Sequence, residues 1–109
     1  MQRQHGAYIY ARYSTENQDA DSIDVQVGKC TQYCSQRGLP ILGVFADEAV
    51  SGMKESRPRF DAMMAQLGMG LADTVVCYDQ SRLFRKMTAW FDLREKLSVM
   101  GVAVISVTQ

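Results

Sequence analysis

Three apolar runs of this 109-residue sequence are each followed by side chains that could handle a phosphate group. The set contains serine hydroxyls, carboxylates and several cations, and in chain order it comprises Arg12, Ser14, Asp47, Glu48, Ser51, Arg57, Asp79, Ser81, Arg82, Arg85 and Lys86. A guanidinium keeps its charge and offers a planar fork of donors that fits two phosphate oxygens. Donors placed in advance around developing charge are usually the largest catalytic contribution. These residues therefore predict a phosphoryl-transfer site.

The nucleophile expected at this site is Ser14, whose hydroxyl needs activation because its own pKa is high. Nearby cations could lower that pKa, and no general base is evident. The single histidine, His5, precedes the first apolar run and is expected on the wrong side of the sheet. A Ser-His-Asp triad is therefore disfavoured.

Apolar runs alternate with amphipathic stretches along the chain, which predicts an α/β fold. We expect strands at 7–11, 41–46, 74–78 and 102–107. The helices between them are expected to start at Asp21 or Ser22, at Pro58 and near Met87, and to stop at glycines. Polar loops are expected from Ser14 to Asp21 and from Asp47 to Arg57. The sheet should be mainly parallel, with four to five strands and helices on both faces, and ligands bind beyond the carboxyl ends of such strands.

The composition is that of one globular domain. Basic and acidic residues balance at 12 each, so bulk electrostatics does not indicate nucleic-acid binding, and a local arginine cluster would have to provide it. No apolar run approaches the ~20 residues that span a bilayer, and the polar start does not look like a secretory signal, which predicts a cytoplasmic protein. The three cysteines are expected to be buried thiols and to form neither a disulfide framework nor a zinc site.

Four blocks of the sequence resemble the serine site-specific recombinases, the superfamily of resolvases, invertases and large serine integrases. They are Tyr-Ala-Arg-Tyr-Ser-Thr at 10–15, Asp-Val-Gln at 24–26, Asp-Glu-Ala-Val-Ser-Gly at 47–52, and Ser-Arg-Leu-Phe-Arg at 81–85. The Arg57-Pro58 pair and the helix after it are most similar to the large serine recombinase, integrase and transposase branch. The resemblance implies a resolvase-like domain, flavodoxin-like in layout.

The resemblance implies that Ser14 attacks a DNA phosphate, forms a 5′-phosphoserine link and releases a 3′ hydroxyl. Arg12, Arg82 and Arg85 would bind the scissile phosphate, and Arg57 belongs with them in the implied catalytic set. The implied supporting residues are Gln18, Gln26, Asp47 and Ser51. No metal and no cofactor is implied. The implied partners are DNA and further copies of the protein, with homodimers assembling into a tetramer on DNA, and no membrane. The implied origin is bacterial, or a phage or mobile element.

Two departures from the family pattern leave alternatives open. Ser81 stands where many members have an aspartate, and Asp79 lies two residues earlier. The long helix and the DNA-binding region that follow the family's catalytic domain are missing, so residues 1–109 are expected to be a fragment that is inert alone. The alternatives are a degenerate recombinase-like oligomerisation module and a flavodoxin-like small-molecule-binding domain. The residues do not distinguish integrase, transposase, invertase and resolvase, nor do they give the target DNA sequence.

Overall fold

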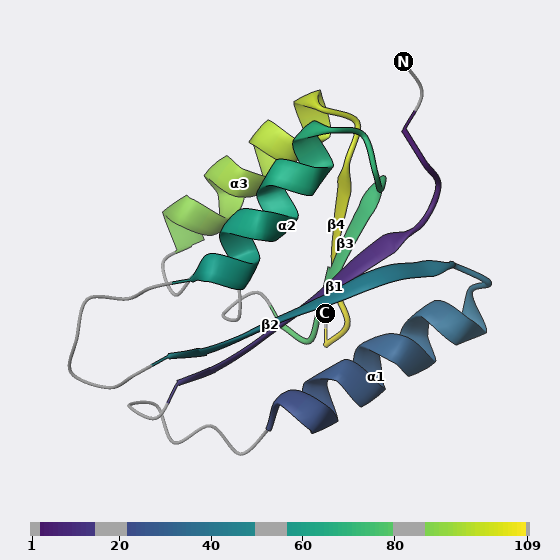
Figure 1. Cartoon of the computed structure of the whole chain (residues 1–109), viewed down its shortest axis with the longest axis vertical. Coiled ribbons are helices and arrows are strands. Elements are labelled where there is room, and N and C mark those ends of the chain that lie inside the picture. The colour runs from purple at the N-terminus through teal and green to yellow at the C-terminus, as the bar shows by residue number, and fades with distance from the viewer. Residues whose placement is uncertain (1–2, 15–21, 50–56, 80–86, 109) are drawn as a thin grey trace.

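The computed structural model describes residues 3–14, 22–49, 57–79 and 87–108 of the chain (Figure 1). Strands and helices alternate along it, in the order β1 (Ala7–Ser14), α1 (Ile23–Gln36), β2 (Ile41–Ala49), α2 (Pro58–Gly68), β3 (Thr74–Cys77), α3 (Met87–Val99) and β4 (Ala103–Ser106). The four strands form one sheet in the order β2-β1-β3-β4. Every neighbouring pair of strands is parallel. The predicted α/β fold with a mainly parallel sheet is confirmed.

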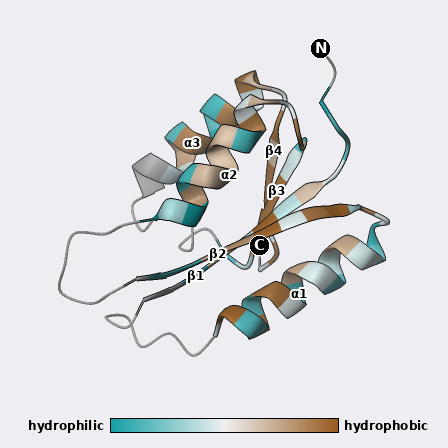
Figure 2. Ribbon diagram, in the orientation of Figure 1, coloured by the Kyte–Doolittle hydropathy of each residue, from teal (hydrophilic) through white to brown (hydrophobic). Residues whose placement is uncertain are grey.

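Helices cover both faces of this sheet, because its apolar side chains point alternately to the two sides. In Figure 1, α1 lies on one face, and α2 and α3 lie on the other. The core beneath α2 and α3 includes Tyr8, Tyr10 and Phe45. The core beneath α1 includes Ile9 and Val76. Figure 2 shows hydrophilic residues on the outer helix surfaces and on the last part of β2.

Local signals set the helix ends as expected. The Ser22 hydroxyl caps α1 by accepting a hydrogen bond from the Val25 N–H at 3.3 Å. Gly38 follows α1 with φ of +63°, a conformation that costs glycine little because it has no Cβ. Pro58 opens α2, where its missing N–H is not needed. Among the described residues, no helix is both long enough and apolar enough to cross a membrane.

Two strands are longer than the sequence predicted, and three polar residues assigned to loops lie in them. Ser14 is the last residue of β1, and Asp47 and Glu48 lie inside β2. The pairing of β1 with β2 continues through Arg12 with Asp47 and ends at Ser14 with Ala49. Polar residues are typical of loops in a sequence, but here the hydrogen-bonded pairing of β1 with β2 keeps them extended. The two strands therefore carry polar side chains past the end of β3.

The three cysteines are free and buried, as predicted. Burial, assisted by the neighbouring Cys34, raises the pKa of Cys30 to about 12. Burial also raises the pKa of Cys34. A nucleophilic cysteine needs a lowered pKa. The two thiols of α1 therefore do not have the properties of a catalytic nucleophile.

Candidate active site

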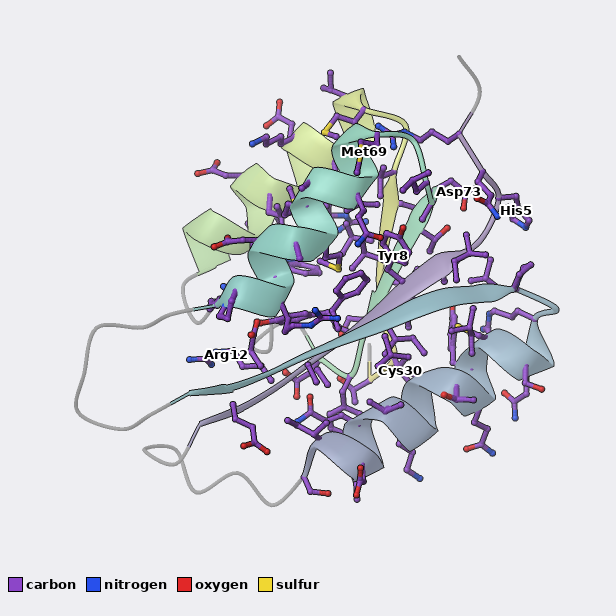
Figure 3. The ribbon with its side chains drawn as sticks, in the orientation of Figure 1. His5, Tyr8, Arg12, Cys30, Met69 and Asp73 are labelled. Atoms are coloured by element: carbon purple, nitrogen blue, oxygen red, sulfur yellow. The ribbon has the colours of Figure 1, made fainter. Side chains whose placement is uncertain are left out.

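Arg12 lies at the carboxyl edge of the sheet and is fixed there through its backbone. It is 7% exposed. The side-chain carboxamide of Gln26, in α1, binds both backbone groups of Arg12: Nε2 donates to the carbonyl oxygen at 2.9 Å, and Oε1 accepts from the N–H at 3.2 Å. Figure 3 shows the Arg12 side chain on the side of the sheet that α2 covers.

The length of β3 explains why a glutamine is needed at position 26. Alternate residues of a strand present their N–H and C=O groups to opposite neighbours, and the Gly6 carbonyl accepts from the Thr74 N–H of β3. Arg12 is six residues further on and therefore faces the same side, but β3 ends at Cys77, opposite Tyr10. The fully buried Gln26 supplies the donor and the acceptor that a longer β3 would have provided. The Gln26 carboxamide therefore makes the two hydrogen bonds that a residue of a neighbouring strand would make with Arg12.

Asp47 connects β2 to the start of α2. The residue is 4% exposed. Oδ1 accepts from the Arg59 N–H and Oδ2 from the Phe60 N–H, both at 3.0 Å. These are orphan donors of the first helical turn, which are usually satisfied by the helix's own N-cap side chain. In the described part of the chain, the N-cap residue of α2, Arg57, makes no such bond with its side chain. A neighbouring strand therefore provides the cap.

Arg57 is held against two aromatic rings at the same edge. Its guanidinium carbon lies 4.2 Å from the centre of the Phe60 ring and 5.3 Å from that of Tyr10. Its Nε donates to the Tyr10 hydroxyl at 3.2 Å. That hydroxyl in turn donates to Asp47 Oδ2 at 2.8 Å. Arg57, Tyr10 and Asp47 thus form one hydrogen-bonded chain beneath the first turn of α2.

Four of the nine predicted site residues have side chains that the structure describes, and their contacts bring all four to this edge: Arg12, Gln26, Asp47 and Arg57. Ser14 is described as the last residue of β1. The other four predicted residues, Gln18, Ser51, Arg82 and Arg85, lie outside the described residues, as does Ser81.

Tyr10 was missed by the sequence analysis as a site residue. A tyrosine inside an apolar strand is normally read as core, and Tyr10 is indeed fully buried. The available signal was its spacing, because Tyr10 and Arg12 share one face of the strand. Asp47, its acceptor, is 37 residues away in the chain.

His5 lies at the opposite edge, as predicted, and has no part in this network. Its Nδ1 is 2.9 Å from Asp73 Oδ2. Figure 3 shows His5 and Asp73 together, far from Arg12. Within the described ranges, no three histidine, cysteine or carboxylate residues are grouped so that they could hold a metal ion.

The chain is similar in sequence and in fold to known proteins. The family model described as the resolvase N-terminal domain matches residues 7–109. Two solved structures resemble the fold over nearly all of the chain. The N-terminal catalytic domain of TP901-1 integrase has a TM-score of 0.81 and 27% identity, with 94% of this chain and 77% of that one covered. The C-terminal catalytic domain of ISC1926 TnpA, an IS607-like serine recombinase, has a TM-score of 0.75 and 28% identity, with 93% and 68% covered.

Two curated relatives are similar in sequence. A putative DNA recombinase of Bacillus subtilis (strain 168) is 33% identical over 101 residues, which are 91% of this chain and 20% of the relative. A resolvase of Clostridium perfringens is 30% identical over 98 residues, 90% of this chain and 47% of the relative. The chain therefore spans from a fifth to about half of the length of these relatives.

Proposed function

Since the chain belongs to the resolvase N-terminal domain family, we propose that it is the catalytic domain of a serine recombinase, which cuts and rejoins DNA with Ser14 as nucleophile. The Ser14 oxygen gives up its proton and bonds to phosphorus, the bond from phosphorus to the 3′ oxygen breaks, and that oxygen takes up a proton. The 5′ end stays on the serine. A 3′ hydroxyl reverses the step and rejoins the DNA, so no external energy source is required.

The position of Arg12 is the observation that best supports this proposal. Arg12 is buried at the carboxyl edge of the sheet, is fixed there by Gln26, and lies two residues before Ser14 in the same strand. Fixed guanidinium groups stabilise the charge that develops on phosphate oxygens without reorganising during the reaction. Arg57, held by Tyr10 and Phe60, adds a second guanidinium at this edge. Arg82 and Arg85 complete the proposed set.

We propose a larger context as well. In it, residues 1–109 act together with a downstream helix and a DNA-binding region, as homodimers that pair into a tetramer on DNA. Whether the outcome is site-specific recombination, integration or transposition depends on those regions and on the DNA.

The test is to trap the covalent intermediate with the complete gene product that contains this chain. The protein is incubated with DNA carrying the ends of its native element, the reaction is stopped with denaturant, and adducts are mapped by mass spectrometry. We expect a 5′-phosphate adduct on Ser14. The Ser14→Ala variant should bind the same DNA and melt within a few degrees of the wild type, yet give no adduct.

Either of two results would refute the assignment. Adduct formation by Ser14→Ala would show that another group is the nucleophile. The absence of an adduct with wild-type protein that demonstrably binds and pairs the DNA would favour the non-catalytic oligomerisation module.

A further inference from the structure

We propose that Glu48 weakens the binding of DNA at the carboxyl edge of the sheet, so that cleavage depends on binding energy supplied from outside the site. The Glu48 carboxylate lies beside the path of the DNA backbone and repels its phosphates. This inference rests on the proposed function, because it concerns the same DNA. The observation behind it is an exposed carboxylate next to the proposed nucleophile that the hydrogen-bond network of the site does not include.

The strand register places Glu48 close to Ser14. Glu48 pairs with Tyr13 where β1 and β2 run side by side, one step before Ser14. Neighbouring strands lie about 4.8 Å apart, and successive residues of a strand are about 3.3 Å apart, so the Cα atoms of Glu48 and Ser14 are about 6 Å apart. A phosphate that reacts with Ser14 is therefore near enough to interact electrostatically with a charge on Glu48.

The Glu48 side chain lies on the side of the sheet opposite to that of Asp47, because successive side chains of a strand alternate. Asp47 is buried beneath α2, whereas Glu48 is exposed. Figure 2 shows this last part of β2 as hydrophilic. In the part of the chain that the structure describes, the Glu48 side chain has neither an ion pair nor a hydrogen bond. None of the described side chains therefore neutralises its charge.

Glu48 thus lies across the sheet from the arginines of the site. Figure 3 shows Arg12 on the side that α2 covers, and Arg57 is the N-cap residue of α2. On the side that α1 covers, Asp24 is a second exposed carboxylate, in the first turn of the helix. Asp24 has a structural role there, because a negative charge stabilises a helix N-terminus. Glu48, in a strand, has no such role.

Protection of a sheet edge is the ordinary explanation for a charged residue at this position. The strand order makes β2 an edge strand, and charged side chains on an edge prevent pairing with another chain. A lysine protects an edge as well as a glutamate does. The two explanations therefore differ in what they predict for Glu48→Lys. Edge protection predicts unchanged DNA binding, whereas repulsion predicts tighter binding.

Coulomb's law gives the size of the expected effect. In water, removing one charge at roughly 10 Å from a phosphate changes the affinity about twofold. DNA presents several phosphates, so about threefold is expected for Glu48→Gln, and about tenfold for Glu48→Lys because the charge is then reversed. Salt screens such interactions over about 10 Å at 0.1 M and over shorter distances at higher concentration. The effect should therefore shrink as salt is added.

The first experiment measures binding without cleavage. The complete gene product carrying Ser14→Ala is titrated into a fluorescently labelled duplex of unrelated sequence, and anisotropy gives Kd. At 0.05 M salt we expect Glu48→Gln to lower Kd about threefold and Glu48→Lys about tenfold, with smaller gains at 0.2 M. The matched control is Glu95→Gln, which makes the same change of net charge at an exposed glutamate of α3. It should leave Kd within about 1.5-fold, because it lies about 12 Å along that helix from its start.

The second experiment measures cleavage with Ser14 in place. Adduct formation on saturating native DNA ends should keep its single-turnover rate within about twofold in all three variants, whereas adducts on unrelated DNA should rise at least about threefold in Glu48→Lys. Wild-type Kd in Glu48→Lys, or equal shifts in Glu48→Gln and Glu95→Gln, would overturn the inference. So would a lower maximal rate with unchanged Kd. If the wild type formed no adduct on any DNA, the proposed function would fail, and the anisotropy titrations would still decide the role of Glu48.

Discussion

Asp47 and Asp73 lie at opposite edges of the sheet, where they accept similar hydrogen bonds but differ in exposure to solvent. Each carboxylate accepts from at least one backbone N–H group and from a side-chain hydroxyl. Asp47 takes two N–H groups of α2 and the Tyr10 hydroxyl. Asp73 takes the Gly6 N–H and the Thr74 hydroxyl, and pairs with His5. The Asp47 residue is 4% exposed, whereas the Asp73 side chain is 28% exposed.

The polar network at the carboxyl edge orients side chains, whereas the polar network at the amino edge fastens the backbone. At the carboxyl edge, Asp47 and Gln26 are buried, and each holds an element that carries an arginine. At the amino edge, Arg3 donates to the carbonyl groups of Leu67, in the last turn of α2, and of Met100, directly after α3. Those bonds fasten the segment before β1 to the ends of the two helices. The variants below should therefore affect stability at both edges, but DNA cleavage only at the carboxyl edge.

The largest effect is expected from Asp47→Ala. Losing a helix cap costs about 1 kcal/mol, and leaving the buried Tyr10 hydroxyl without its acceptor costs about 1–3 kcal/mol. We expect the free energy of unfolding to fall by about 3 kcal/mol in denaturant titrations, and adduct formation to be lost.

Asp61→Ala is the control for this change. Asp61 is also acidic and lies in the first turn of α2, but it is exposed. Its removal should change stability by no more than about 0.5 kcal/mol. If the two alanine variants were equally stable, the capping role of Asp47 would be wrong.

The next largest effect is expected from Gln26→Ala. It leaves the Arg12 N–H and C=O buried without the partner that the carboxamide provides, which should cost about 2 kcal/mol. The Arg12 amide should also lose protection in hydrogen exchange followed by NMR. Gln32→Ala, an exposed glutamine of the same helix, should change neither property by much. An Arg12 amide that remained protected in Gln26→Ala would contradict the strand-like role of Gln26.

The sequence predicts the elements well and the site network poorly, and both outcomes have local causes. Apolar runs with glycine and proline between them determine where strands and helices form, as at Gly38 and Pro58. The role of Gln26 depends on where β3 stops, and the role of Tyr10 depends on a carboxylate 37 residues away. The residues next to Gln26 and Tyr10 in the sequence do not indicate where β3 ends or which carboxylate Tyr10 binds. Ser14 and Asp47 looked like loop residues because strand pairing, and not their own preference, keeps them extended.

The smallest effect is expected at the amino edge, from Asp73→Asn, and it should depend on pH. Burial alone would raise the pKa of Asp73, but hydrogen bonds from Gly6, His5 and Thr74 outweigh it, so the pKa is lowered. A carboxyl whose pKa is lower in the folded state stabilises the fold above its unfolded pKa of about 3.9, and this contribution is lost as the pH falls through the folded value.

At neutral pH, the asparagine variant should therefore be less stable than the wild type, by under about 1 kcal/mol because the group is partly exposed to solvent. Below about pH 4, the two stabilities should converge. Denaturant titrations at several pH values between 2.5 and 7 would measure this difference, with adduct formation at neutral pH as the second readout. A gap that widened in acid would contradict the sign of the shift. A large loss of cleavage would contradict the different roles of the two edges, because the hydrogen-bond partners that the described residues give Asp73 are Gly6, His5 and Thr74, all at the amino edge.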